Sequence, residues 1–192
     1  DAIKKIKKIK ISNENEQEKI DLLFGDIYLK INQIDKAEEF YQKTFFTSNE
    51  EIEARTFIGL AEVRLAQGKL SDAIKYAEQS IQINSNKVRP KIILAIAKTR
   101  IGDKDEALEI LNNLYSNQKN NADVNLALAG FYSSFDDNDA AIKVLEKFMY
   151  SISHYLWSRN FIKNVIDLSS EEYYMTRSDW IAYYLAKSGK NI

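Results

Sequence analysis

Few residues in this chain are of the types that carry catalytic or metal chemistry. Its 192 residues include one histidine, His154, and no cysteine, which excludes cysteine nucleophiles, disulfide frameworks and zinc sites built on cysteine. No serine forms a recognisable nucleophile motif with His154, and a base without an oriented nucleophile makes no catalytic triad. The six glycines form no phosphate-binding or dinucleotide-binding loop. We therefore predict that the chain is not an enzyme and holds neither a metal nor a cofactor.

The clusters of acidic residues lack the further groups that known sites need. The run Asp136-Asp137-Asn138-Asp139 resembles the start of a calcium-binding loop, but it lacks the glycine at loop position six and the glutamate at position twelve. The pairs Glu38-Glu39 and Glu50-Glu51 have no apolar surroundings in the sequence that would make a carboxyl group a general acid. We interpret these carboxylates as turn residues and exposed helix residues, with i,i+4 pairing to Lys43 on one helix.

The composition indicates helices as the elements that position these residues. With one proline, 45% hydrophobic and 29% charged residues, the chain is typical of a globular protein and not of a disordered or turn-rich β chain. No apolar run of about 18 residues predicts a membrane span. The net charge is −1: residues 1–11 carry five Lys and one Asp, and residues 12–54 carry eleven acidic and four basic residues. No region has the sustained basic excess of a nucleic-acid-binding protein.

A repeat of about 34 residues organises the chain. An alanine recurs at intervals of 36, 34 and 34 residues, at Ala37, Ala73, Ala107 and Ala141. Twelve residues before each of them lies a small residue, preceded by a large apolar one: Gly25, Ala61, Ala95 and Ala129, after Phe24, Leu60, Leu94 and Leu128. Small residues at a fixed helical phase let a neighbouring helix approach closely. Each unit is therefore predicted to be a pair of packed helices.

Turn and cap residues recur with the same period. A glycine or a short polar residue, typical of the position just past a helix end, marks each inter-helix turn at Asn32, Gly68, Gly102 and Asp136. Short polar residues follow, and we predict them as N-caps of the second helices: Asp35, Ser71, Asp105 and Asp139. The pattern predicts helical hairpins over residues 18–51, 54–87, 88–121 and 122–155, with residues 1–17 as a partial preceding unit.

These units resemble the tetratricopeptide repeat (TPR) family. The first copy carries most of the family's pattern, at Phe24, Gly25, Tyr28, Ala37 and Tyr41. The family's late proline is replaced in the four copies by Asn49, Ser85, Lys119 and Ser153. The resemblance implies an all-α, right-handed superhelical solenoid of helix-turn-helix repeats over residues 1–155. Residues 156–192 depart from the period, so we expect irregular capping helices there, with a truncated further repeat.

Stacked hairpins bury their small-residue sides, which leaves the first helices to line a concave surface. Helical phase, together with the family resemblance, assigns the following residues to this partner-binding surface: Leu22, Asp26, Arg55, Ile58, Glu62, Leu65, Arg89, Ile92, Ile96, Arg100 and Leu126. The pattern is an apolar stripe with charges beside it, which suits an extended or helical partner segment with apolar anchors. An equal alternative is that packing between units shields part of the stripe. Asp26 disfavours a clamp for a C-terminal carboxylate, because like charges repel.

The C-terminal region is rich in aromatic residues. We interpret them as a capping layer that closes the solenoid, and the alternative is an aromatic docking patch for a partner or a second copy, formed by Tyr155, Trp157, Tyr173, Tyr174 and Trp180. The Lys-rich residues 1–11 are interpreted as part of a preceding repeat, and a membrane-surface or nucleic-acid segment is the alternative.

The predicted function is a non-catalytic scaffold that binds a partner peptide or helix in the concave groove. Two alternatives stay open: a self-association module, which would make the chain a homo-oligomer, and a regulatory TPR segment of a larger enzyme or of an envelope or secretion complex. We predict no nucleic-acid partner. The expected compartment is cytoplasmic or periplasmic, with the chain soluble and a segment of a larger protein.

Overall fold

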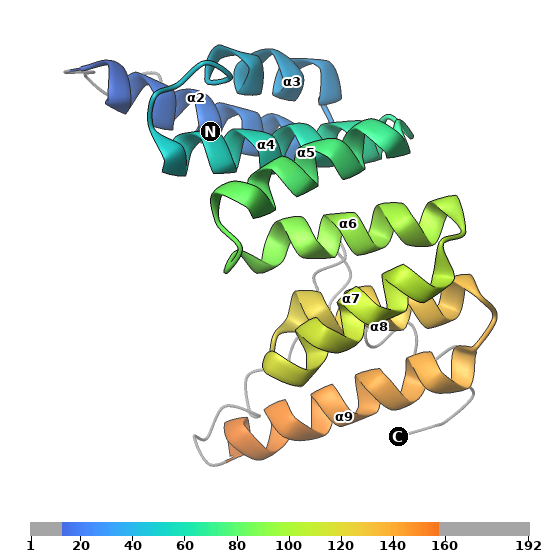
Figure 1. The fold of residues 1–192 in the computed structure, drawn as a ribbon. Helices are drawn as coiled ribbons and strands as arrows, with labels where there is room; N and C mark the ends of the chain where they lie inside the picture. The colour runs from blue at the N-terminus through green and yellow to red at the C-terminus, as the bar shows by residue number, and fades with distance from the viewer. Residues whose placement is uncertain (1–12, 158–192) are drawn as a thin grey trace. The chain divides into compact units, whose positions relative to one another are not determined.

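The computed structural model describes residues 13–157 of the chain, with side chains to residue 151. Every regular element in this range is an α-helix (Figure 1): α2 (Glu14–Lys30), α3 (Ile34–Lys43), α4 (Glu50–Ala66), α5 (Leu70–Ile83), α6 (Val88–Ile101), α7 (Lys104–Asn117), α8 (Ala122–Ser134) and α9 (Asn138–Trp157). The predicted all-α fold of helical hairpins is confirmed. Helix α2 begins four residues before the first predicted hairpin, because Asn13 caps it by accepting a hydrogen bond from the backbone N–H of Glu16 at 2.9 Å.

The described residues divide into two compact units, one that ends at residue 107 and one that begins at residue 108. In the first unit each helix packs against the next, from α2 to α6. In addition, α2 packs against α4, and α4 against α6. Thus the first helices of successive hairpins lie side by side, which is the contact pattern of a stacked helical repeat. In the second unit, α8 packs against α9 around Ala129, Ala141, Leu145 and Phe148.

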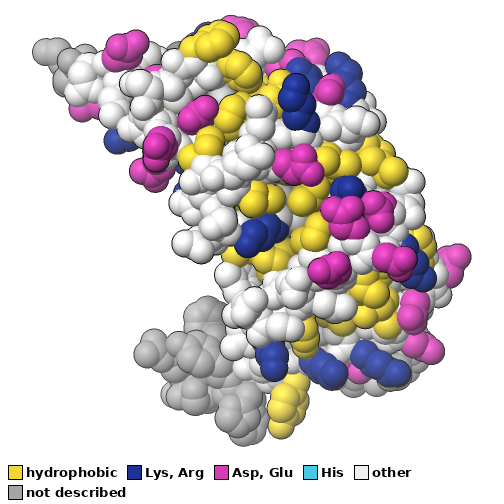
Figure 2. All heavy atoms as spheres, in the orientation of Figure 1, with side chains coloured by type: hydrophobic (Ala, Val, Ile, Leu, Met, Phe, Trp, Pro, Cys, Tyr) yellow, Lys and Arg dark blue, Asp and Glu magenta, His cyan; other side chains and the backbone are white. Residues whose placement is uncertain are grey.

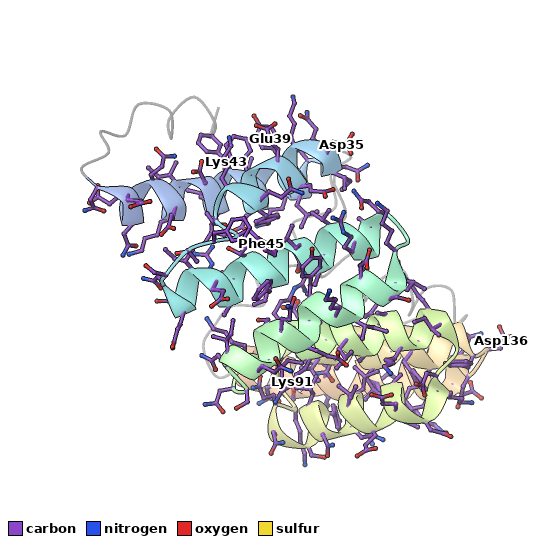
Figure 3. The ribbon with its side chains drawn as sticks, turned by 45° about the horizontal axis from the view of Figure 1, so that its top comes forward. Asp35, Glu39, Lys43, Phe45, Lys91 and Asp136 are labelled. Atoms are coloured by element: carbon purple, nitrogen blue, oxygen red, sulfur yellow. The ribbon has the colours of Figure 1, made fainter. Side chains whose placement is uncertain are left out.

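The predicted turns inside the four hairpins have a left-handed backbone. The φ angle is positive at all four predicted positions: 58° at Asn32, 74° at Gly68, 94° at Gly102 and 61° at Asp136. Glycine adopts this conformation without a steric penalty, and Asn and Asp tolerate it better than other residues. Figure 3 shows Asp136 at the turn between α8 and α9. The turn prediction is confirmed at each of these residues.

The predicted N-caps of the second helices are wrong. Helices α3, α5, α7 and α9 begin at Ile34, Leu70, Lys104 and Asn138, so Asp35, Ser71, Asp105 and Asp139 lie inside the first turn, as Figure 3 shows for Asp35. Acidic residues there are stabilised by the helix dipole, so the N-cap preference and the first-turn preference favour the same side chains.

Asparagine caps several of the first helices. The Asn49 Oδ1 atom accepts hydrogen bonds from the backbone N–H groups of Glu51 and Ile52, at 3.0 and 3.2 Å. Asn121 caps α8 in the same way, with the N–H groups of Asp123 and Val124 at 3.0 and 3.3 Å. Asn49 is one of the residues that replace the family's proline, and its capping bonds give that replacement a structural reason.

A tyrosine fills the space between two glycines at the centre of the first unit. Tyr41, on α3, is 1% exposed, and its ring lies against Gly25 of α2 and Gly59 of α4. A Cβ atom added at Gly25 would lie 2.6 Å from Cε1 of Tyr41, and one added at Gly59 would lie closer still. The small residue predicted at position 25 therefore serves the close approach expected of it.

Candidate partner-binding surface

Ion pairs connect the first helices of successive hairpins. Arg55 of α4 donates to Asp26 of α2 at 3.0 Å, and both side chains are about two-fifths exposed. Arg89 of α6 forms the equivalent pair with Glu62 of α4. Each acid stands at the ninth position of its predicted repeat and each arginine at the second position of the next one. Four of the five charged residues predicted for the partner-binding surface are thus paired with each other across neighbouring helices.

Two further contacts fix this surface to the helices beneath it. The hydroxyl of Tyr41 donates to Asp26 Oδ1 at 2.8 Å, so the buried tyrosine holds the carboxylate that receives Arg55. Burial, with Asp26 alongside, raises the pKa of Tyr41 far above its ordinary value, so the hydroxyl keeps the proton that it donates. Arg100 of α6 donates to the backbone carbonyl oxygen of Leu65 on α4 at 3.1 Å.

We call the following residues of the first helices the first-helix face: Asp26 and Lys30 of α2, Arg55, Ile58, Glu62 and Leu65 of α4, and Arg89, Ile96 and Arg100 of α6. Ile58 and Leu65 lie three or four residues from Arg55 and Glu62, and Ile96 lies four residues before Arg100, so each is on the same side of its helix as the connecting residues. Ile58, Leu65 and Ile96 are partly exposed. The face therefore combines apolar surface with charges held in register.

Two residues of the predicted apolar stripe are not on the surface. Leu22 is 1% exposed and Ile92 is 2% exposed, so neither can contact a partner. Leu22 packs in a core cluster with Ala37, Tyr41 and Leu60, because its position on α2 faces the second helix of the hairpin. Leu126, in the second unit, is partly buried against the cluster of Ala129 and Leu145.

A second polar network lies on the side of the first unit that holds α3. Glu38 of α3 accepts from Arg64 of α4 at 2.7 Å and from Gln67 at 2.8 Å, and the Arg64 hydrogen bond lowers the pKa of Glu38. Its neighbour Glu39 pairs with Lys43 at 3.3 Å, as predicted, and Figure 3 shows both side chains on α3. Glu38 thus joins one hairpin to the next, which the spacing of the sequence did not indicate.

Several exposed hydrophobic side chains were not predicted. Phe46, in the loop between α3 and α4, is 92% exposed, and on α9 Tyr150 is 74% exposed. Phe46 lines a cleft of about 730 Å³ between this loop and the start of α2, whose other lining residues are polar and include Glu14, Glu16 and Glu18. Figure 2 shows hydrophobic side chains interspersed with Lys, Arg, Asp and Glu side chains.

The predicted aromatic docking patch lies almost wholly outside the described residues. Tyr155 and Trp157 belong to α9, but their side chains are not described, and Tyr173, Tyr174 and Trp180 lie outside the described range, as do residues 1–12. Among the side chains that the structure describes, those of residues 13–151, no three potential metal ligands group together. No helix in that part of the chain is both long enough and apolar enough to cross a bilayer.

Comparison with known proteins finds a family match to one stretch of the chain and solved structures of similar fold. Residues 22–43 match the tetratricopeptide repeat family model. The TPR protein TTC0263 of Thermus thermophilus is 16% identical, with a TM-score of 0.62 over 69% of this chain and 73% of that one. A TPR protein of Parabacteroides merdae is 15% identical, with a TM-score of 0.63 over 90% and 71%. YrrB, described as a TPR protein with an unusual peptide-binding site, is 17% identical, with a TM-score of 0.52 over 69% and 67%. No curated protein matches the sequence significantly.

Proposed function

We propose that this chain, which has the tetratricopeptide repeat fold, is a non-catalytic scaffold that binds a segment of a partner protein on its first-helix face. The observation that carries the proposal is the ladder of ion pairs, Asp26 with Arg55 and Glu62 with Arg89, which runs beside the partly exposed Ile58, Leu65 and Ile96. YrrB, a protein of similar fold, is described as having a peptide-binding site, and we extend that class of ligand to this chain.

The mechanism follows from the side chains of the face. Burying the remaining exposed area of Ile58, Leu65 and Ile96 against a partner supplies the favourable binding free energy. Complete burial of one aliphatic side chain contributes about 1.5–3 kcal/mol, and these partly exposed side chains each contribute a fraction of that. The paired charges hold the apolar side chains at fixed spacing on neighbouring helices, so little conformational entropy is lost on binding. A partner segment with apolar side chains at matching spacing is selected over one without them.

Affinity capture with a double variant tests this proposal. Ile58→Glu with Ile96→Glu places two charges in the contact area, while both positions are exposed enough for the fold to survive, as a circular dichroism melt will check. Gln82→Glu with Asn112→Glu, at exposed positions of the second helices α5 and α7, also adds two negative charges and serves as the matched control. Proteins captured by the wild type and the control but lost from the face variant support the proposal. Identical capture by all three proteins would rule out the first-helix face.

Self-association is the second candidate function, and the exposed hydrophobic residues of α9 favour it. Met149 is 36% exposed and Tyr150 is 74% exposed, and an exposed tyrosine is a residue type enriched at contact surfaces. Light scattering over a range of protein concentrations tests it, with Tyr150→Ser as the variant. A mass that stays that of a monomer at all concentrations would exclude self-association.

A further inference from the structure

The basic residues of the first-helix face are not all compensated by acids. Helix α6 carries Arg89, Lys91, Lys98 and Arg100 and no acidic residue. Arg89 is paired with Glu62, and Lys98 contacts Asp103 and Glu106. Arg100 instead donates to a neutral carbonyl oxygen, that of Leu65, and remains exposed. A full positive charge therefore lies in the last turn of α6, beside the last turn of α4.

The same edge of the face carries a second basic residue. Lys30, in the last turn of α2, stands at the thirteenth position of its predicted repeat, as Arg100 does two repeats later, and it is exposed. The residue at that position of the intervening repeat is Ala66, which is small and uncharged. Since Asp26 and Glu62 are engaged by Arg55 and Arg89, the uncompensated charge of the face lies at this edge and is positive.

This edge contrasts with the charge of the surrounding sequence. Residues 12–54 carry eleven acidic and four basic residues, and the chain as a whole has a net charge of −1. An acidic segment is repelled by most of the first hairpin but attracted to Lys30 and Arg100, whereas a basic segment experiences the opposite forces. Such complementarity selects the partner and its orientation more than it adds affinity.

We propose that the partner segment is acidic and amphipathic, with apolar side chains against Ile58, Leu65 and Ile96 and carboxylates against Arg100 and Lys30. This inference rests on the proposed function, because it names the class of partner for the same face. Arg55 and Arg89 assist, since a guanidinium has five N–H donors, and each uses only one of its nitrogen atoms toward its acidic partner.

Selection of random displayed peptides on the immobilised chain tests the inference. Enriched peptides are synthesised with a fluorophore, and their affinity is measured by anisotropy at about 0.1 M and about 1 M salt, where the Debye length is about 10 and about 3 Å. We expect an excess of Asp and Glu among apolar residues. Lys30→Glu with Arg100→Glu weakens binding about tenfold or more at low salt, since reversing two exposed contacts changes the binding energy by about 1.4 kcal/mol. The control Lys75→Glu with Lys143→Glu makes nearly the same charge change and leaves the affinity as it was.

The face variant distinguishes failure of this inference from failure of the proposed function. The selected peptides could lack an excess of acidic residues and still lose binding in the Ile58→Glu, Ile96→Glu protein. That result would overturn the inference about the partner and would support the binding face. Acidic peptides that bind equally well to the two charge variants would also overturn it. Peptides whose binding is unchanged in the Ile58→Glu, Ile96→Glu protein would overturn the binding face itself, and the inference with it.

Discussion

The packing of Tyr41 between two glycines makes an unusual prediction about helix stability. Replacing glycine by alanine inside a helix normally stabilises it, by about 1 kcal/mol. At Gly59 of α4 the new methyl group would overlap the ring of Tyr41. The ring cannot turn aside, because Gly25 lies on its other side and Asp26 holds its hydroxyl.

The magnitude follows from these two opposing terms. Overpacking of a filled core costs about 1–3 kcal/mol, and the helix gains about 1 kcal/mol. Gly59→Ala is therefore expected to destabilise the first unit by up to about 2 kcal/mol. Gly130 of α8 supplies the matched control, because a Cβ added there would meet nothing within 4 Å among the described residues. Gly130→Ala is expected to stabilise its helix by up to about 1 kcal/mol.

Amide hydrogen exchange is the suitable assay, since helical repeats can open locally and a single melting temperature averages over them. At about 2 kcal/mol, protection of the α2 and α4 amides in Gly59→Ala falls by a factor of about 30. In Gly130→Ala protection of the α8 amides rises. Greater protection in Gly59→Ala than in the wild type, as expected for Gly130→Ala, would refute the packing argument. In a Tyr41→Leu background the ring that the methyl group meets is absent. Adding Gly59→Ala to Tyr41→Leu should therefore cost less stability than adding Gly59→Ala to the wild type.

Two predictions concern pH. The hydrogen bond from Arg64 lowers the pKa of Glu38 below its unfolded-state value of about 4.5. The ionised carboxylate therefore stabilises the fold above that pH, and this contribution is lost as the pH falls below it. Urea titrations from neutral to acidic pH should show a smaller loss of unfolding free energy in Glu38→Gln than in the wild type, and the same pH profile in both would contradict this. Burial raises the pKa of Tyr41, so its phenol stays protonated in the folded state at a pH where a tyrosine in the unfolded chain ionises, near pH 10; the folded state therefore loses stability as the pH rises above about 10. Absorbance titrations of Tyr41→Phe and of the wild type should show the same number of ionising phenols until the chain unfolds. One additional phenol that ionises near pH 10 in the folded wild type and not in the variant would disprove the prediction.

Local features of the fold were predictable from the sequence. The inter-helix turns at Asn32, Gly68, Gly102 and Asp136 were predicted because few residue types suit the position just past a helix end, where the structure has positive φ angles. The N-caps of the second helices were not predicted correctly, because Asp is also favoured in the first turn of a helix, where Asp35 lies.

Contacts between hairpins could not be predicted from the sequence pattern. Asp26 and Arg55 are 29 residues apart in sequence and Glu38 and Arg64 are 26 residues apart, and spacing along the chain does not reveal which charges meet. The predicted apolar stripe was wrong at Leu22 and Ile92 for a related reason. Leu22 lies at the border between the face and the packed side of α2, and its burial depends on the partner helix.

The Tyr41 packing also limits how hairpins can be rearranged. If the hairpin of α4 and α5 were excised, Asp26 would meet Arg89, the residue that corresponds to Arg55, and the ion pair would be restored. Tyr41, however, would then meet Ile93, which stands where Gly59 does in the preceding repeat, and the ring and the branched side chain would compete for one space. Excision of this hairpin would thus preserve the ion pair but not the packing of Tyr41, so the tyrosine restricts which hairpin can follow its own.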